Sequence, residues 1–383
     1  MPRSSARAGV YTRQPAGYQA FEPAPLPPSP PIDLHRLEPF LSRANVALGR
    51  LDGMADVLPN PDLFVAMYVR NEAVLSSQIE GTQASLDDVL EYEAGIPSGE
   101  DGRPPDVVDV YTYGRALNFG LARLNELPLS LRLLREIHAK LLEDTRGGEK
   151  TPGEFRRTQN WIGAGRCTIE DAVFVPPPHL KLQTFLDDLE CYLRADDPTP
   201  VLLRCGVAHC QFETIHPFLD GNGRLGRLLI TLLLCERGVL RRPLLYLSLH
   251  FKRNQSEYYE WLMRVREEGD WEGWLRFFLE GVEIVSDDAV ITARRVLALQ
   301  SEHRALVSQN LPNKPTPLRA LDLLAIHPVT TAPTLQEALK ITTPTAYTII
   351  NDLERLGLLV ESTGKQRNRV FRYSPYLDAL TPR

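Results

Sequence analysis

Apolar residues repeat with a helical period along most of the chain. Between residues 32 and 94, leucines recur three, four and seven positions apart in LHRLEPFLSRANVALGRL, and the same spacing continues in DLFVAMYVRNEAVLSSQIEG. This spacing places one apolar stripe on an amphipathic helix. Further helices are predicted at VVDVYTYGRALNFGLARLNEL, LRLLREIHAKLLED, LKLQTFLDDLECYLRA and PTPVLLRCGVAHCQFETI. The pattern therefore predicts a mainly α fold.

Three stretches depart from this period. Short β-branched and aromatic pieces flank Glu170 and Asp171 in NWIGAGRCTIEDAVFVPPP, which predicts a β-hairpin. Beyond Leu311 the pattern predicts three helices and then a two-stranded wing, the element order of a winged helix-turn-helix domain. The prolines of FEPAPLPPSPP favour polyproline II and predict an extended arm, draped over the protein or disordered, with an SH3-like partner as the alternative.

These changes in texture divide the chain into five segments. We expect a Pro-rich tail at 1–31, an N-terminal helical unit at 32–100 and a helical core at 101–285. A linker helix and hinge at 286–314 would then lead to the winged helix at 315–383. The 383 residues are enough for two or three domains of ordinary size.

Composition excludes several classes of protein. The 43 Lys and Arg against 49 Asp and Glu give a net charge of −6, so the whole chain is not a polybasic nucleic-acid binder. Its five cysteines form an odd set without a CxxC pair, which argues against a disulfide framework or a zinc knuckle. The N-terminus lacks the apolar region of a signal peptide, and no run of eighteen apolar residues occurs. We therefore expect a cytoplasmic protein without membrane partners.

The chemistry concentrates in HPFLDGNGRLGR, residues 216–227, between two predicted helices. Its glycines allow unusual backbone conformations, and a loop that leads into a helix N-terminus is an anion site. Arg224 and Arg227 are three residues apart and can share a helix face toward phosphate oxygens. Asp220 supplies a carboxylate suited to Mg²⁺, and His216 titrates near neutrality and can act as a general base.

HPFLDGNGRLGR resembles HxFx(D/E)GNGRxxR, the signature of the Fic (filamentation induced by cyclic AMP) family of protein adenylyltransferases. The resemblance implies a Fic-type helical core with a β-hairpin flap, and transfer of AMP from ATP to a Ser, Thr or Tyr hydroxyl of a target protein, the protein itself included. His216 would then be the catalytic base, and Asp220 would hold Mg²⁺. Retention of Gly223 favours AMP transfer over the γ-phosphate transfer of a related branch. The nucleotide-binding residues implied are Gly221, Asn222, Gly223, Arg224, Leu225, Gly226 and Arg227, together with Ile162, Gly163 and Tyr258.

Upstream, SSQIEG at residues 76–81 fits (S/T)xxxE(G/N), which resembles the inhibitory helix motif of Fic proteins. Read alone, a Ser and a Glu four residues apart are common on a solvated helix. The resemblance assigns Ser76, Glu80 and Gly81 an inhibitory role, in which Glu80 pairs with Arg227 and withdraws it from the γ-phosphate. We therefore expect autoinhibition, and whether the same glutamate helps to remove AMP is left open.

The resemblance also makes the hairpin a flap that binds the target backbone, with Val173, Phe174 and Val175 near the target. A homodimer is left open as a further partner. DNA is left open too, because Lys365, Arg367, Arg369 and Arg372 cluster in the predicted wing, whereas Asp352 and Glu354 on the predicted recognition helix would repel DNA. Alternative functions on the same fold are transfer of another nucleotidyl or phospho group, removal of AMP, or DNA-binding regulation by a nucleotide-sensing core.

Overall fold

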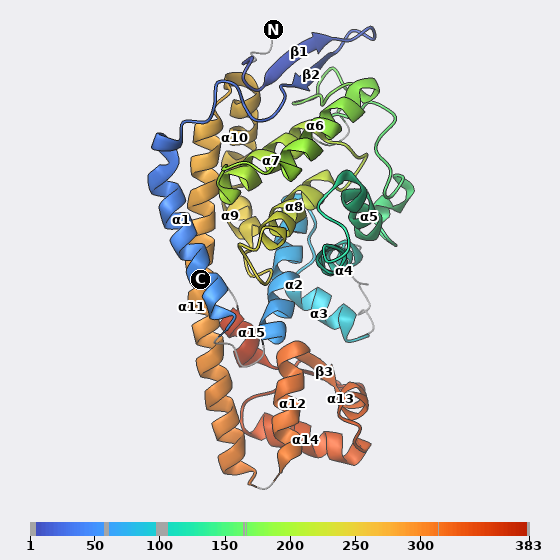
Figure 1. Ribbon diagram of the computed structural model, residues 1–383. Helices are drawn as coiled ribbons and strands as arrows, with labels where there is room; N and C mark the ends of the chain where they lie inside the picture. Colours follow the sequence, from blue (N-terminus) through green and yellow to red (C-terminus); the bar gives the residue numbers. More distant parts are fainter. Residues whose placement is uncertain are drawn as a thin grey trace.

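The computed structural model describes residues 5–56, 61–96, 106–163, 165, 167–312 and 314–380, and helices make up most of it (Figure 1). The mainly α fold class predicted from the apolar period is confirmed. Ahead of the C-terminal part, the helices are α1 Leu34–Met54, α2 Pro61–Ile79, α3 Leu86–Glu93, α4 Val107–Arg123, α5 Leu131–Leu141, α6 Leu182–Arg194, α7 Val201–Ile215, α8 Asn222–Glu236, α9 Leu247–Arg253, α10 Gln255–Glu268 and α11 Trp271–Asn310. Short 3₁₀ turns occur at Arg146–Glu149 and His179–Lys181.

Two consecutive helices, α7 and α8, form the centre of the core. All of α7 except its first residue is buried, as is every residue of α8 from Arg224 to Leu234. A helix that is buried on all sides must be covered by neighbours on all sides, and its polar side chains need partners there. Helices α6, α10 and α11 pack against α7, while α4 and α5 pack against α8. The loop that joins α7 to α8 is therefore held by a rigid, fully covered helix pair.

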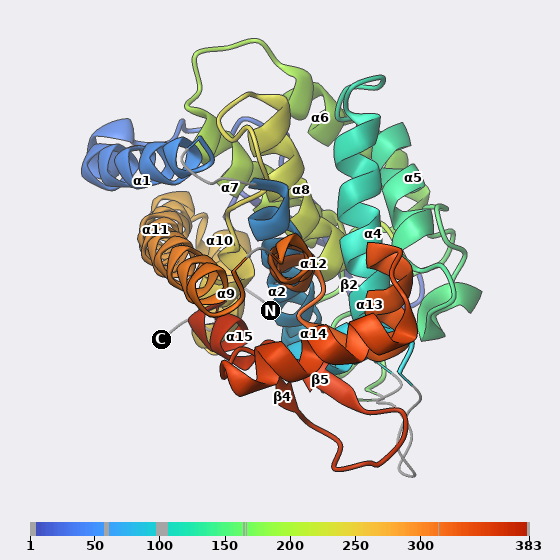
Figure 2. The same cartoon turned by 90° about the horizontal axis from the view of Figure 1, so that it is seen from below.

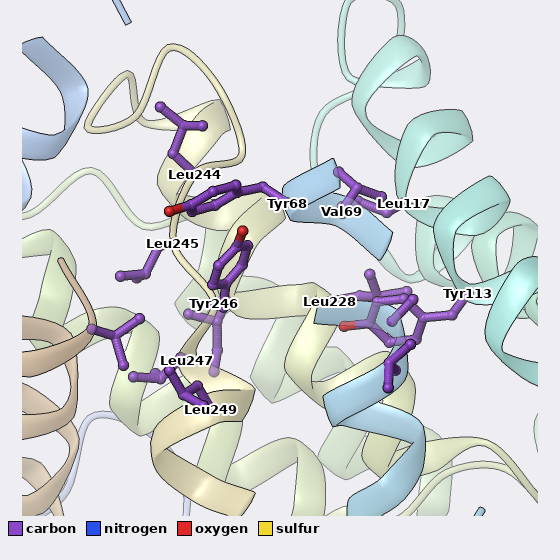
Figure 3. Close-up of a cluster of buried hydrophobic side chains, with 14 of the residues drawn as sticks. Tyr68, Val69, Tyr113, Leu117, Leu228, Leu244, Leu245, Tyr246, Leu247 and Leu249 are labelled. Atoms are coloured by element: carbon purple, nitrogen blue, oxygen red, sulfur yellow. The ribbon is translucent and has the colours of Figure 1, made fainter. Parts of the chain in front are cut away.

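Helix α2 lies against this core and ends beside that loop. It packs on α4, α8 and α9, and the Tyr68 ring of α2 stacks on the Tyr246 ring at 4.0 Å between centroids (Figure 3). Both tyrosines are almost fully buried. This aromatic contact fixes the middle of α2, and so determines where the residues after Ile79 lie relative to α8.

The N-terminal residues form a packed hairpin, so the interpretation of residues 1–31 as an extended arm was wrong for this part. Strands β1 Gly9–Arg13 and β2 Gln19–Pro23 pair antiparallel, and Phe21 is fully buried against Phe174. The proline run hid the apolar pair of Ala20 and Phe21, whose burial supplies the driving force. Arg7 fixes the start of the segment by a two-pronged pair with Glu272, both bonds being 2.7 Å long.

Helix α11 is 40 residues long, or about 60 Å at the usual rise. It packs along α1 and continues without a break to the C-terminal part (Figure 1). The boundary expected at residue 285 therefore falls inside one continuous helix. The boundary expected at residue 100 lies outside the described residues.

The C-terminal part, residues 315–380, combines helices with a small antiparallel sheet whose strand order is β3-β5-β4. Figure 2 shows β4 and β5 beside α14. The first half of this part gives the predicted helices, but β3 and α15 were not predicted. It rests on the N-terminal unit, because α12 packs against α2 and Arg372 pairs with Asp87 and Glu91 of α3. Its elements are α12 Pro315–Ile326, β3 Val329–Thr331, α13 Ala332–Leu339, α14 Thr343–Arg355, β4 Val360–Glu361, β5 Val370–Arg372 and α15 Ser374–Leu380. Within the described ranges, none of the helices has the length and apolar character needed to cross a bilayer.

Candidate functional site

The loop between α7 and α8 is shaped by two residues in the left-handed region. His216 has φ +49°, which ends α7, and Gly221 has φ +74°, which turns the chain into α8. The side chain of Asn222 closes the loop, since its Oδ1 accepts from Phe218 N at 2.8 Å and its Nδ2 donates to Phe218 O at 2.9 Å. The side chain of Asn222 therefore stabilises the loop, in addition to the role in nucleotide binding predicted for this residue.

Three side chains support this loop from beneath. Arg156 Nε and Asn160 Nδ2 donate to the carbonyl of His216 at 3.0 and 3.1 Å. His138 stacks on Phe218 at 3.8 Å, and its Nδ1 accepts from Gly153 N at 2.8 Å. Its Nε2 consequently carries the proton and donates to the carbonyl of Asp220 at 2.9 Å. The sequence analysis found none of these supports, because each lies far from the loop in the chain.

The imidazole of His216 is neutral at ordinary pH. Burial lowers the pKa of His216 to about 4, although the nearby Glu80 carboxylate acts in the opposite direction. Its buried Nδ1 has no hydrogen-bond partner among the described residues. Because Nδ1 is buried, Nε2 is the nitrogen of this neutral ring that is left to accept a proton from a substrate hydroxyl.

The first turn of α8 presents a cradle for anions. Its backbone amides are free of intrahelical bonds at a helix N-terminus, where the helix dipole favours negative charge. A Cβ on Gly223 would lie 2.1 Å from Glu80 Oε1, so only glycine leaves room for an oxygen here. Arg224 lies beside the cradle with its side chain 8% exposed, and its buried Nη1 has no partner within the described residues.

A carboxylate from the end of α2 already occupies this cradle. Arg227 Nη2 donates to Glu80 Oε1 at 2.8 Å and to the carbonyl of Ser76 at 2.9 Å, while Arg227 Nε donates to Ser76 Oγ at 2.7 Å. Burial would raise the pKa of Glu80, but the guanidinium groups of Arg227 and Arg224 outweigh it and lower the pKa below its ordinary value. The side chain of Glu80 is thus ionised, and its carboxylate lies in the cradle where a phosphate group would otherwise bind. Gly81, with φ +94°, lets the chain turn away directly afterwards.

Two buried carboxyl groups lie behind the cradle, and the sequence analysis did not identify either. Glu213 Oε1 would lie 2.2 Å from a Cβ on Gly226, which explains the glycine at that position. Glu72 on α2 accepts from Tyr113 Oη at 3.1 Å and from Ser248 Oγ. Burial raises the pKa of each carboxyl to about 7.

Among the described residues of the flap, one β-bridge joins Ile162 to Phe174. Ile162 and Phe174 exchange two backbone hydrogen bonds, of 2.8 and 3.1 Å. Side chains alternate along such an extended segment, so Val173 is 64% exposed whereas Phe174 and Val175 are buried. Phe174 lies under the guanidinium of Arg266 at 3.8 Å. Of the three residues expected near a target, Val173 is the exposed one, and contact of any of them with a target stays a prediction.

The remaining predicted residues divide between the site and the core. Ile162 and Gly163 lie in the flap, Gly163 close against Cys167, and Leu225 is buried in α8. Tyr258 was expected to contact the nucleotide, but its ring is 1% exposed, and its hydroxyl is 2.9 Å from His209 Nε2. Its neighbour Tyr259 is 44% exposed, and its hydroxyl is 3.4 Å from the carbonyl of Ile79. Of the two neighbouring tyrosines, Tyr259 is therefore the exposed one, and the nucleotide contact that the resemblance implied for Tyr258 stays a prediction.

Asp220 is the one predicted metal ligand, and its surroundings fit that role. Its carboxylate is 44% exposed and lies 3.6 Å from Arg224 Nη2, at the open end of the loop. No cluster of three or more His, Cys, Asp or Glu ligands occurs within the described ranges. A magnesium ion that accompanies a nucleotide needs only one or two protein carboxylates, because phosphates and water complete its shell.

Two segments of the chain match known family models. Residues 128–234 match the Fic/DOC family, and residues 39–122 match the Fic/DOC family N-terminal domain. The chain is 29% identical over 218 residues to a protein adenylyltransferase Fic of Culex quinquefasciatus, a match over 55% of this chain and 39% of that protein. It is 28% identical over 208 residues to a probable protein adenylyltransferase of Aquifex aeolicus, over 54% of this chain and 57% of that protein.

The fold is also similar to that of solved Fic structures. A Fic family protein from Desulfovibrio desulfuricans aligns with a TM-score of 0.56 at 20% identity, over 88% of this chain and 95% of that one. The chain spans 39% and 57% of the length of these two curated relatives. The similarity to the Fic/DOC family is thus located at residues 39–122 and 128–234.

Proposed function

We propose that this chain is an autoinhibited protein adenylyltransferase, which transfers AMP from ATP to a Ser, Thr or Tyr hydroxyl of a target protein. The observation that carries the proposal is the joint geometry of His216, the amide cradle at Gly221–Gly223 and the Glu80–Arg227 pair. The names of the curated relatives, protein adenylyltransferase Fic in Culex and probable protein adenylyltransferase in Aquifex, support it.

The proposed chemistry uses the loop as follows. His216 takes the proton from the target hydroxyl, whose oxygen attacks the α-phosphorus of ATP. The bond from that phosphorus to the β-phosphate bridging oxygen breaks, diphosphate leaves, and AMP stays on the target oxygen. The amides at the start of α8 and the guanidinium of Arg224 stabilise charge on the phosphates, which is the main task in phosphoryl-type transfers. Mg²⁺ held by Asp220 would neutralise phosphate charge when bound.

The proposed inhibition follows from the position of Glu80. An ATP γ-phosphate that reached Arg227 would meet a carboxylate already hydrogen-bonded to it at 2.8 Å. Two negative groups this close repel each other, and the 39% exposure of the Glu80 side chain screens part of that repulsion. ATP would therefore bind weakly, or in a pose that leaves the α-phosphorus out of line with the hydroxyl.

Transfer of label from ATP tests the proposal and separates it from the alternatives. Purified protein is incubated with Mg²⁺ and either α-labelled or γ-labelled ATP, using Glu80→Gly to relieve inhibition and Glu80→Gly/His216→Ala as the inactive match. We expect label on protein from α-labelled ATP only, and none in the double variant. Label from γ-labelled ATP would instead indicate phosphate transfer, and equal labelling by both variants would exclude His216 as the base.

A further inference from the structure

The surface of α14 in the C-terminal part is unusually free of negative charge. Thr343, Thr345, Tyr347, Thr348 and Asn351 are exposed along one side of the helix, and Tyr347 is 43% exposed. All carry uncharged hydrogen-bonding groups. Helix α14 lies across the face of the C-terminal part seen from below (Figure 2).

Asp352 and Glu354, the two carboxylates expected from the sequence to repel DNA, are held in ion pairs. Asp352 is only 16% exposed and pairs with Lys314 and Arg355, both at 3.2 Å. Glu354 pairs with Arg369 at 3.4 Å. Charges neutralised in this way contribute little to the field at the exposed side of α14. In the folded protein, Asp352 and Glu354 should therefore repel DNA only weakly.

The wing next to α14 adds positive charge. Its only acid, Glu361, is used to shape the turn, since its carboxylate accepts from Thr363 N at 3.0 Å and from Gly364 N at 2.8 Å. Lys365 and Arg367 are exposed at the tip, and no ion pair holds either of them within the described ranges. Figure 2 shows this loop projecting from β4 and β5 beside α14.

Charge distinguishes this surface from the rest of the chain. Residues 340–372 contain six Lys and Arg against three Asp and Glu, whereas the whole chain has a net charge of −6. The excess positive charge is concentrated on a helix with a polar exposed side and an adjacent loop. This combination matches a duplex, in which a helix reaches base edges in the major groove while basic side chains contact phosphates.

We propose that the C-terminal part binds double-stranded DNA, with α14 in the major groove and Lys365 and Arg367 on the phosphate backbone. Asn351 and Tyr347 would contact the base edges or the walls of the groove. This binding site is separate from the nucleotide cradle at α8 and does not depend on the proposed transferase activity.

Fluorescence anisotropy of the full chain with a short labelled duplex of random sequence tests the proposal. At low salt we expect binding that excess ATP does not displace and that is tighter than to a single strand of the same sequence. Lys365→Ala/Arg367→Ala should weaken binding roughly tenfold and reduce the slope of log K against log salt by about 2, because each phosphate contact contributes about 0.9. Asn351→Asp, which places a charge on the exposed side of α14, should also weaken binding.

The matched control removes two exposed basic residues elsewhere. Arg50→Ala/Arg132→Ala changes the net charge by the same amount on α1 and α5, and we expect it to leave the affinity and the salt slope unchanged. The proposal is overturned if no duplex binds at low salt, if the control weakens binding as much as the wing variant, if ATP displaces the duplex, or if single strands bind as tightly.

Discussion

Replacing Glu80 by glycine isolates the contact that would hold this protein inactive. In the structure the carboxylate of Glu80 lies against Gly223 and accepts from Arg227 at 2.8 Å. The substitution removes both the negative charge and the volume from the cradle. Ser76 still holds Arg227 through two hydrogen bonds, so the guanidinium should stay in place and become available to the γ-phosphate.

The size of the effect follows from the bond that is removed. Arg227 is fully covered and Glu80 is partly exposed, with side-chain exposures of 2% and 39%. A hydrogen bond between charged groups contributes roughly 1.5–3 kcal/mol. If ATP must break this bond to use Arg227, its removal should raise kcat/KM by about 10- to 150-fold, at 1.36 kcal/mol for each factor of ten.

The assay measures initial rates of self-modification with α-labelled ATP over a range of ATP concentrations. Glu80→Gln keeps the volume and removes the charge, and should give a smaller increase than Glu80→Gly. Glu268→Gly is the matched control, because Glu268 also precedes a glycine at the end of a helix but pairs with Arg264, and it should behave as wild type. Equal kcat/KM for wild type and Glu80→Gly would refute the reasoning.

Three further predictions concern pH and packing. In Glu80→Gly, kcat/KM should stay constant as the pH is lowered to about 5 and should decrease as it approaches 4, because burial lowers the pKa of His216 to about 4. A decrease in kcat/KM that begins near pH 6.5 would contradict this. Burial raises the pKa of Glu72 from 4.5 to about 7, so the native protein binds more protons than the unfolded chain between these values and should lose stability as pH rises from 4.5 through 7. Glu72→Gln should reduce the change in the free energy of unfolding between pH 5 and pH 8, measured by urea unfolding, by up to about 3 kcal/mol. An equal change in the wild type and in Glu72→Gln would exclude a raised pKa of Glu72. Phe21→Ala should cost about 3–5 kcal/mol of local stability and speed amide exchange in both the N-terminal hairpin and the flap around Phe174, whereas unchanged exchange would mean that the two are not coupled.

The sequence predicted best where local pattern decides structure. The helices follow the apolar period, and residues 216–227 form the loop and helix start that their glycines indicated. The pairing of Glu80 with Arg227 was anticipated through a resemblance, since no spacing rule joins residues 147 positions apart.

The sequence-based predictions failed where contacts between distant segments determine the structure. The buried carboxyls Glu72 and Glu213 gave no signal, because their burial depends on helices that meet only in the folded protein. A proline-rich composition hid the strand that buries Phe21. Tyr258 and Tyr259 differ by one position, and only the packing of α10 determined which ring is exposed.

Intact mass spectrometry of Glu80→Gly incubated with ATP and Mg²⁺ tests the central claim most directly. The account predicts that the protein gains the mass of one or more AMP groups on hydroxyl side chains, and that Glu80→Gly/His216→Ala gains none. A gain that corresponds to phosphate alone, or no gain in Glu80→Gly when ATP is bound, would contradict it.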